Sequence, residues 1–183
     1  IGADGANSFV RNNLCFDKVK TTLTLQYIVD IQPEHSILKF FYDEKYFGDY
    51  KWIFPNGNTT KIGFPHNEHK QFKVEGTIIK KQARLIGHGG IKNNVKGNIL
   101  LVGDAAGQTN SLSKGGIRPG MYAGKLAAES IIVHNNPLYY EEKWKRCPFN
   151  SQIMNDALEQ LKTMNNLQII EHLAPFKGNT LSA

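Results

Sequence analysis

Short apolar runs between Thr21 and Pro65 are rich in β-branched and aromatic residues, which is typical of β-strands. Short polar clusters that contain Pro, Gly, Asn or Asp separate these runs, as expected of turns. The Asn56-Gly57 pair predicts a tight hairpin, because both residues tolerate a positive φ. We therefore predict an antiparallel sheet whose strands lie within residues 22–32, 36–43, 50–54 and 59–64.

Elsewhere the apolar residues mainly follow helical spacing. A short helix is predicted directly after the Asp4-Gly5 turn. Longer helices are predicted at residues 69–82, 116–134, 139–146 and 151–172. The last of them carries its apolar residues on one face. Residues 98–103 are instead predicted to form a buried strand.

The composition is that of a globular protein. Of the 183 residues, 40% are hydrophobic, and no apolar run approaches the roughly 20 residues of a membrane span. Cys15 and Cys147 are too few for a disulfide framework, which favours a reducing, cytoplasmic location. The net charge of +6 favours anionic partners, including a membrane surface that the protein would contact peripherally. The lysines are scattered and no nucleic-acid-binding motif is present, which argues against nucleic acid as a partner.

The candidate chemistry is concentrated in GNILLVGDAAGQTNSLSKGGIRPG, residues 97–120. A buried strand, residues 99–102, brings Asp104 to the carboxyl edge of a sheet, where ligands of open α/β folds bind. Small residues around Asp104 let another molecule approach the backbone. Gly115 and Gly116 open a helix whose N-terminus carries a partial positive charge. These features suit a nucleotide-like cofactor, although an isolated Gly-Asp pair is also typical of an ordinary turn.

This stretch resembles the second flavin-binding motif of the FAD-dependent oxidoreductases related to para-hydroxybenzoate hydroxylase. GADGANSFVR, residues 2–11, resembles the other motif of that group, and the two motifs occur here in the order typical of the family. The resemblance implies FAD as the cofactor. The residues that it implies near the pyrophosphate are Asp4, Gly5, Ser8 and Arg11. Those that it implies near the ribityl chain and the flavin ring are Gly103, Asp104, Ala105, Gly107, Gly115, Gly116 and Ile117.

The segment around Asp4 also has a simpler interpretation. An Asp-Gly pair before a short helix is an ordinary capped turn. Arg11 lies about one helical turn after Ser8, so either the two residues form a phosphate-facing pair or Arg11 is a solvated helix residue.

Tyr50, Trp52, Phe54 and Pro55 form the pattern Y-x-W-x-F-P. A period of two places the three rings on one face of a strand. Such a face is either the core side of a sheet or a wall for a long apolar ligand. The pattern resembles the signature of the geranylgeranyl reductases, flavoproteins that saturate prenyl chains in archaeal lipids and in chlorophyll.

The sequence departs from the usual pattern of that family at three positions. Phe47 stands three positions before the tyrosine, where a proline is usual. Ser111 stands where proline is common, and Lys114 stands where glycine is common.

The resemblance implies FAD-dependent reduction of isoprenoid (geranylgeranyl) double bonds in lipid biosynthesis, with an isoprenoid lipid substrate held by Tyr50, Trp52 and Phe54. Two alternatives remain open. A FAD-dependent monooxygenase would share both flavin motifs, and a non-catalytic lipid-binding module would share the aromatic strand and the positive charge. No catalytic residue is assigned: Tyr50 and ordered water are both candidate proton donors, whereas Cys15 is more typical of a small core residue. The sequence identifies no external electron donor.

The implied fold class is α/β (α+β), with part of a Rossmann-like FAD-binding domain, an inserted antiparallel substrate domain and a C-terminal helical segment. We expect FAD-domain segments at residues 1–20 and 85–135, the substrate domain at 21–84 and C-terminal helices at 136–183. Family members open with a G-x-G-x-x-G turn that this sequence does not contain. We therefore expect the chain to be a C-terminal portion that binds FAD poorly when alone.

Overall fold

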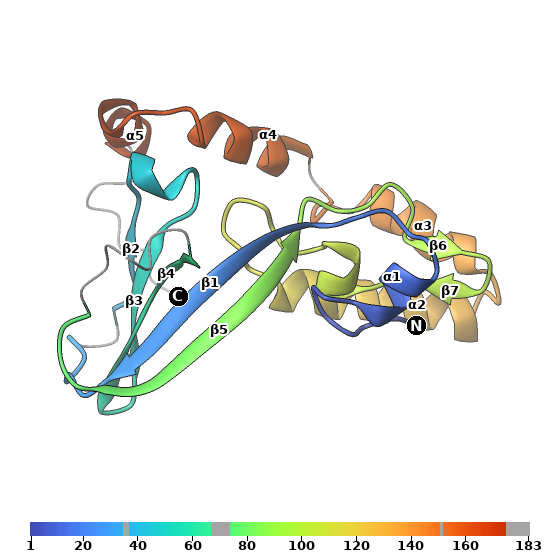
Figure 1. Cartoon of the computed structure of the whole chain (residues 1–183). Helices are drawn as coiled ribbons and strands as arrows, with labels where there is room; N and C mark the ends of the chain where they lie inside the picture. The colour runs from blue at the N-terminus through green and yellow to red at the C-terminus, as the bar shows by residue number, and fades with distance from the viewer. Residues whose placement is uncertain (35–36, 67–73, 151, 175–183) are drawn as a thin grey trace. The chain divides into compact units, whose positions relative to one another are not determined.

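The computed structural model describes residues 1–34, 37–66, 74–150 and 152–174. Its largest sheet has five strands in the order β2-β3-β4-β1-β5 (Figure 1). These strands are β1 (Lys20–Val29), β2 (Lys39–Phe41), β3 (Lys51–Asn56), β4 (Thr59–Pro65) and β5 (Ile78–His88). β3 pairs antiparallel with both β2 and β4. The antiparallel sheet predicted from residues 21–65 is confirmed.

β3 and β4 form the hairpin that the Asn56-Gly57 pair predicts. Asn56 pairs with Thr59 as the last residue of β3, and Gly57 begins the turn with a φ of +62°. Of the two turn-forming residues, the glycine is therefore the one that takes the positive φ.

The helix predicted at residues 69–82 is wrong where the structure describes it. Residues 67–73 lie outside the described part of the chain, and from Ile78 onward the chain is strand β5. β5 lies beside β1, and the Thr24 hydroxyl of β1 donates to the Arg84 carbonyl of β5 at 3.0 Å. Pairing with a neighbouring strand overrides the helix propensity of the lysine and glutamine residues in this segment.

The helices predicted after the Asp4-Gly5 turn and at residues 116–134 and 139–146 are confirmed. They are α1 (Phe9–Asn13), α2 (Ile117–Ile132) and α3 (Pro137–Lys145). α2 and α3 pack against each other, because small side chains on α2 allow a close approach. Their shared core comprises Leu100, Val102, Ala123, Leu126, Ala127, Tyr140, Trp144 and Cys147.

The strand predicted at residues 98–103 is shorter than expected, although Leu100, Leu101 and Val102 are buried. Its regular part is β7 (Ile99–Leu100), which pairs antiparallel with β6 (Val95–Lys96). Gly103 has a φ of +64° and turns the chain out of the extended conformation.

The single helix predicted at residues 151–172 is two helices, α4 (Gln152–Leu161) and α5 (Asn166–Leu173). Asn165 begins the second one with a capping box. Its side chain accepts a hydrogen bond from the Gln168 amide at 3.0 Å, and the Gln168 side chain accepts one from the Asn165 amide at 3.0 Å. This capping interrupts a helix that the apolar spacing alone would continue.

Cys15, expected in the core, is exposed, and it has a φ of +54° just after the end of α1. The end of a one-turn helix offers no core to bury it. Cys147 is buried between α3 and its neighbours.

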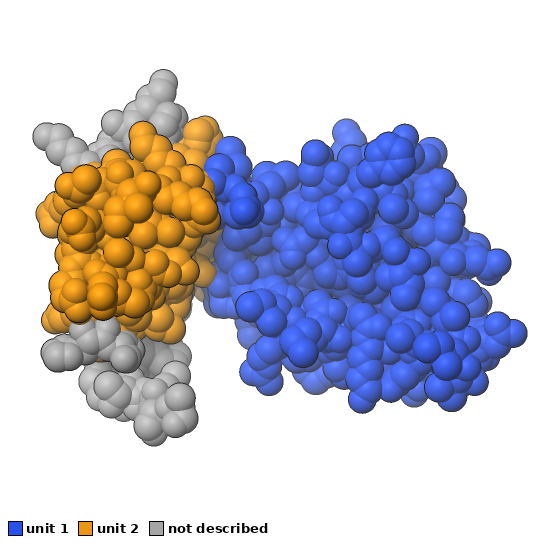
Figure 2. Space-filling view, turned by 90° about the horizontal axis from the view of Figure 1, so that it is seen from below, with its two compact units in different colours: residues 1–24, 83–156 blue, residues 25–82, 157–183 orange. Residues whose placement is uncertain are grey.

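The chain forms two compact units, coloured separately in Figure 2. Unit 1 comprises residues 1–24 and 83–156, and unit 2 comprises residues 25–82 and 157–183. Unit 2 includes β2, β3, β4, α5 and the short 3₁₀ helix η1 (Glu44–Tyr46). In the described residues, every helix is too short or too polar to cross a membrane.

Candidate functional site

The two candidate flavin motifs begin side by side on neighbouring extended segments of unit 1. The Gly2 amide donates to the Leu100 carbonyl at 2.7 Å, and the Val102 amide donates to the Gly2 carbonyl at 3.0 Å. The two segments run parallel. Asp4 and Asp104 therefore both follow at the carboxyl end, the edge at which such folds bind ligands.

Asp104 lies in the tight turn η3 (Gly103–Ala106), and two hydrogen bonds from nearby residues orient its half-buried carboxylate. One carboxylate oxygen accepts a hydrogen bond from the Gly87 amide at 3.1 Å, and the other accepts one from the Thr109 hydroxyl at 3.0 Å. A carboxylate oxygen has two lone pairs, so both oxygens keep the capacity to accept another bond. The carboxylate is thus fixed in direction and still able to bind a ligand hydroxyl.

The first turn of α2 lies against this carboxylate. A Cβ atom on Gly116 would lie 3.4 Å from Asp104 Oδ1 and 3.0 Å from Thr109 Oγ1. The glycine therefore permits a close approach that a side chain would crowd. Gly115, Gly116 and Ile117 also line a pocket of about 480 Å³. The structure thus brings together the carboxylate and the helix start that the sequence predicts to act on one ligand.

In the first motif, Asp4 and Ser8 bond to each other. The Ser8 hydroxyl donates to Asp4 Oδ1 at 2.5 Å and accepts from the Arg11 amide at 2.9 Å, as the N-cap of α1. The second oxygen of Asp4 accepts from the Val10 amide at 3.1 Å. Partial burial alone would raise the pKa of Asp4, but these hydrogen bonds outweigh it and lower the pKa. The segment is a capped turn, and Ser8 is buried inside it.

Arg11 joins the two motifs instead of facing a phosphate together with Ser8. Its guanidinium donates to the Ala6 carbonyl at 2.7 Å and to the Ala105 carbonyl at 2.9 Å. The residue is only 6% exposed. A buried guanidinium needs such acceptors to offset its lost hydration. The expected phosphate-facing pair, like the expected solvated surface, is therefore corrected: Arg11 is a bridge from α1 to η3.

Arg11→Lys is expected to lower the free energy of unfolding by about 1–2 kcal/mol, because an ammonium group lacks the planar fork that serves two carbonyls at once. Urea unfolding followed by circular dichroism measures the loss. Arg84→Lys, at an exposed position, is the control and should change the stability by less than about 0.5 kcal/mol. Equal losses in the two variants would contradict the bridge.

Next to the η3 turn lies a network of buried polar side chains that the sequence analysis missed. Gln108 accepts from the Gly103 amide at 2.7 Å and donates to the Tyr140 hydroxyl at 2.6 Å. The Tyr140 hydroxyl donates to the Leu101 carbonyl at 2.8 Å. Burial raises the pKa of Tyr140, so the phenol stays protonated and keeps donating. The signal in the sequence is Gln108, the first residue of a polar run that directly follows a turn of small residues.

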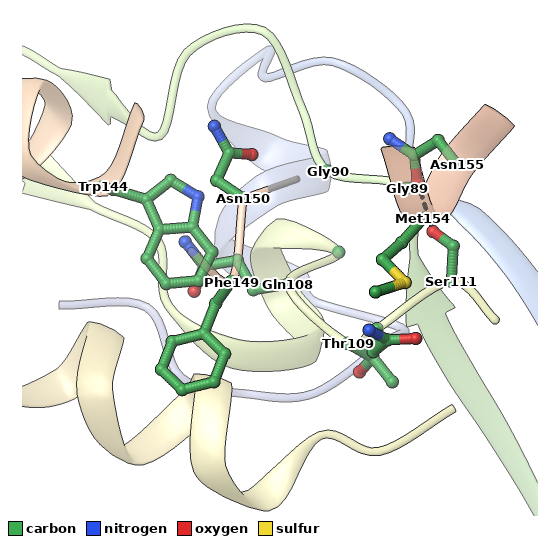
Figure 3. A pocket seen from close by; sticks show the side chains of 12 residues that line it. Gly89, Gly90, Gln108, Thr109, Ser111, Trp144, Phe149, Asn150, Met154 and Asn155 are labelled. Atoms are coloured by element: carbon green, nitrogen blue, oxygen red, sulfur yellow. Dashed lines mark hydrogen bonds between the residues drawn. The ribbon is translucent and has the colours of Figure 1, made fainter. Parts of the chain in front are cut away.

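A small polar pocket beside this network is seen in Figure 3. Gln108, Trp144 and Phe149 are among its lining residues, as is Ser111, whose hydroxyl donates to the side chain of Asn155 on α4. Its volume of about 20 Å³ leaves room for roughly one water molecule. It is too small for a cofactor, and the Ser111–Asn155 bond fastens the loop before α2 to α4.

Two of the residues that depart from the usual family pattern have a positive φ. Lys114 has a φ of +54° and Phe47 a φ of +49°, in the left-handed region. The usual glycine suits the conformation at Lys114. Proline cannot take a positive φ, so the turn at Phe47 differs from one built on proline. The ammonium group of Lys114 donates to the Ser111 carbonyl at 2.7 Å and is folded back onto its own loop.

In unit 2, Tyr50, Trp52 and Phe54 share one face of the sheet, as their spacing predicts. Neighbouring ring centroids are 6.1 Å and 6.4 Å apart. Trp52 packs directly on its cross-strand partner Gly63, which has no side chain to prevent it. A Cβ atom on Gly63 would lie only 2.0 Å from the indole. The indole nitrogen donates to the Gln26 side chain at 3.1 Å. The sequence analysis did not single out Gly63.

Phe40 and Tyr42 extend this aromatic face. The Phe40 ring centroid lies 5.2 Å from Phe54 and 5.3 Å from Tyr50, and the Tyr42 centroid lies 5.5 Å from Tyr50. Burial, with smaller contributions from Tyr42 and Asp49, raises the pKa of Tyr50 to about 12. The aromatic face belongs to unit 2, whereas every candidate flavin residue belongs to unit 1.

Part of the stability of the chain is expected to be lost between about pH 10 and pH 12 through Tyr50. An unfolded tyrosine has a pKa of about 10, whereas folded Tyr50 keeps its proton up to a pKa of about 12. The unfolded chain therefore loses this proton first, so the contribution is complete below pH 10 and disappears as the pH rises through about 12. Tyr50→Phe should lose less stability than the unmodified chain as the pH rises from about 10 to about 12, as measured by urea unfolding. Identical losses of stability in the variant and in the unmodified chain would contradict a contribution from Tyr50.

Comparison with solved structures shows which proteins share this fold. No family model matches the chain. A geranylgeranyl bacteriochlorophyll reductase-like protein from Thermoplasma acidophilum superposes with a TM-score of 0.74 and 19% identity, over 88% of this chain and 48% of that one. A probable FAD-dependent monooxygenase from Pseudomonas aeruginosa superposes with a TM-score of 0.64 and 14% identity, over 95% of this chain and 58% of that one. At these identities the likeness concerns the fold alone, and it confirms the predicted fold class.

The sequence comparison narrows the class. Digeranylgeranylglycerophospholipid reductase 1 from Methanococcoides burtonii is 30% identical over 192 residues, which cover 86% of this chain and 46% of that protein. The chain is a homologue of the geranylgeranyl reductases, as its motifs predict. It spans less than half the length of the curated relatives it matches, 46% and 38% for two of them.

Proposed function

We propose that the chain is part of a flavoprotein that reduces double bonds of geranylgeranyl chains in lipid biosynthesis, with FAD as its cofactor. The homology supports this reaction class. The single observation that carries the cofactor site is the Asp104 carboxylate beside the start of α2. The relative from M. burtonii is named for a glycerophospholipid with two geranylgeranyl chains, and we propose a lipid of this class as the substrate.

The residues at the start of α2 fit a flavin ring, and Asp104 lies next to Gly116 although it is not among the residues that line the pocket there. The pocket at Gly115, Gly116 and Ile117 has a volume of about 480 Å³, within the range of roughly 300–1,000 Å³ of small-molecule sites. Free N–H groups at the start of α2 give a positive potential that favours an electron-rich ring. The lone pairs that remain on Asp104 suit a hydroxyl of the ribityl chain.

The first motif has a narrower role in this proposal than its residue types imply. Asp4 is exposed and Gly5 is half-exposed, and both lie where the parallel segments end. These two positions are the ones open to a pyrophosphate. Ser8 and Arg11 are buried and act by holding the turn and joining it to η3.

A bound reduced flavin would supply the hydride for one carbon of the double bond, and a proton must reach the neighbouring carbon. The aromatic face contributes a flat apolar surface that orients the chain and keeps water from it. Because an alkene has no basic atom, the proton donor must be close and aligned. Tyr50 keeps its phenolic proton up to a pKa of about 12 and is the candidate from this chain.

The test supplies the full-length protein that contains this chain with chemically reduced FAD and a digeranylgeranyl glycerol lipid in detergent, and follows the lipid by mass spectrometry. A gain of two hydrogens for each reduced bond supports the proposal, and unchanged lipid contradicts it.

Asp104→Ala should weaken flavin binding at least about tenfold, because a hydrogen bond to a charged group is lost. Asp156→Ala, at an exposed position of unit 1, is the control and should leave flavin affinity unchanged. Equal affinities in the two variants would remove Asp104 from the site.

Two further measurements distinguish the alternative functions, a monooxygenase and a lipid-binding module. Rapid oxygen consumption with a hydroxylated product favours a monooxygenase, whose fold this chain shares. Sedimentation with lipid vesicles that does not depend on flavin, together with unchanged lipid, favours a lipid-binding module.

A further inference from the structure

Trp52, Gln26 and Gln82 form a chain of side-chain hydrogen bonds across the aromatic face of the sheet in unit 2. The Trp52 indole reaches over Gly63 of β4 and donates to Gln26 Oε1 of β1 at 3.1 Å. Gln26 Nε2 in turn donates to Gln82 Oε1 of β5 at 2.8 Å. The chain of bonds therefore runs from β3 to β5, in the order in which these strands lie in the sheet (Figure 1).

The direction of this chain of bonds is fixed by its first donor. An indole nitrogen can only donate, so the atom of Gln26 that it contacts must be the carbonyl oxygen. The amide nitrogen of Gln26 then faces Gln82, which must accept through its own oxygen. Within the residues that the structure describes, Gln82 makes no other side-chain hydrogen bond. Its NH₂ group therefore ends the chain of bonds as a donor that is available to a ligand.

Lys80 lies on the same side of the sheet as this donor. It stands two residues before Gln82 on β5, and side chains two apart on a strand share a side. Lys81, between them, belongs to the opposite side, where its ammonium group lies 5.8 Å from the centre of the Tyr27 ring. Tyr27 directly follows Gln26 along β1, which agrees with this division of the two sides. A cation and an amide donor therefore stand together on the side that carries the aromatic rings.

The charges of the sheet favour an anion. Every charged residue in its five strands is basic, and these residues are Lys20, Lys39, Lys51, Lys61, Lys80, Lys81 and Arg84. Lys61 is the cross-strand partner of Phe54, so it lies on the same side as Lys80. The aromatic face therefore changes from apolar at β2 and β3 to cationic and hydrogen-bonding at β5.

We propose that Lys80 and Gln82 bind the phosphate of a phosphoglycerol lipid whose prenyl chain lies on the aromatic rings. This inference rests on the proposed function. A phosphate ester is negatively charged and accepts several hydrogen bonds, whereas a prenyl chain makes only apolar contacts. The two ends of such a lipid thus match the two ends of the face. β3 and β5 are three strand spacings apart, roughly 14 Å, which leaves room for glycerol between the rings and the phosphate.

The test uses the full-length protein that contains this chain and three probes, titrated calorimetrically in a non-ionic detergent. The first probe is digeranylgeranylglyceryl phosphate. The second is digeranylgeranylglycerol, which lacks the phosphate, and the third is glycerol phosphate, which lacks the prenyl chains. Affinities for the first two probes separate the contribution of the phosphate from that of the apolar chains.

Three variants change the net charge by the same amount at different places. Lys80→Gln removes the proposed cation. Gln82→Glu keeps the oxygen that accepts from Gln26 and replaces the outward NH₂ group by a negatively charged oxygen. Lys81→Gln is the matched control, because Lys81 is an exposed neighbour of Lys80 on the opposite side of the sheet.

Lys80→Gln should weaken binding of the phosphorylated lipid at least about threefold, and Gln82→Glu at least about tenfold. Both variants should change the affinity for digeranylgeranylglycerol less than about twofold, and Lys81→Gln should change every affinity less than about twofold. Raising the salt concentration from about 0.05 M to about 0.5 M should reduce the effect of Lys80→Gln, because the lysine is exposed to solvent.

Equal losses in Lys80→Gln and Lys81→Gln, or equal affinities of the unmodified protein for the two lipids, overturn the proposal. Glycerol phosphate that binds as tightly as the phosphorylated lipid assigns the site to a free phosphate ester and also overturns it. The proposed function fails separately if Trp52→Ala leaves the affinity for digeranylgeranylglycerol unchanged, because the aromatic face is then not a substrate site. Circular dichroism checks that each variant is folded.

Discussion

The free energy of unfolding is expected to fall by about 2–4 kcal/mol when Gly63 is replaced by alanine. The added methyl group would lie 2.0 Å from the Trp52 ring, a separation that no pair of carbon atoms tolerates. The indole must therefore leave the strand surface and lose its bond to Gln26. Geranylgeraniol affinity should fall with it, because the displaced ring no longer forms a flat wall. Urea unfolding followed by tryptophan fluorescence gives the first quantity, and calorimetric titration gives the second.

Gly124→Ala is the matched control for this substitution. A Cβ atom on Gly124 meets nothing within 4 Å, and the residue lies in the middle of α2. Alanine is favoured over glycine in a helix by roughly 0.5–1 kcal/mol, so this variant should become more stable. If Gly63→Ala behaved like Gly124→Ala, the close contact between the indole and β4 would be disproved.

Gly87→Ala is expected to lower the stability of the chain by about 2–3 kcal/mol and to weaken flavin binding at least about tenfold. The new methyl group would lie 2.4 Å from the backbone carbonyl oxygen of Asp104. The same glycine donates its amide hydrogen to the Asp104 carboxylate at 3.1 Å. Either β5 or the η3 turn must move, and both movements disturb the direction of the carboxylate. Flavin fluorescence titration and urea unfolding measure the two effects.

Leu85→Ala is the control on the same strand. Leu85 is 39% exposed, so its truncation should lower the stability modestly and leave flavin affinity unchanged. A Gly87→Ala variant that is destabilised yet binds flavin normally would show that the Asp104 turn is not a flavin contact.

The features that sequence alone predicted are those encoded within short stretches. The hairpin at Gly57 follows from two neighbouring residues, and α2 follows from its small and apolar residues in a regular order. The Asp104 turn and its helix start were placed together correctly because only a short loop separates them. Local conformational preference and local chemistry agree at these positions, so each could be read without knowing the tertiary structure.

The features that sequence missed depend on partners that are distant in the chain or on competing local bonds. β5 is a strand because β1 lies beside it, and the lysine and glutamine residues at positions 80–82 do not indicate this pairing. Gly63 matters because the register of β3 and β4 sets it opposite Trp52. Asn165 caps the start of α5 after α4 has ended at Leu161, although the apolar spacing passes through it. Each of these outcomes was decided by a contact and not by a propensity.

The hydrogen bond from Arg11 to Ala105 affects the order in which parts of the chain fold during synthesis. Its two ends are 94 positions apart, and all five strands of the largest sheet are encoded between them. Closing so long a loop carries an entropic cost and slows folding. On the ribosome, the first motif must therefore wait without its partner while β1 to β5 emerge, so the sheet is expected to form before the cofactor-binding half closes.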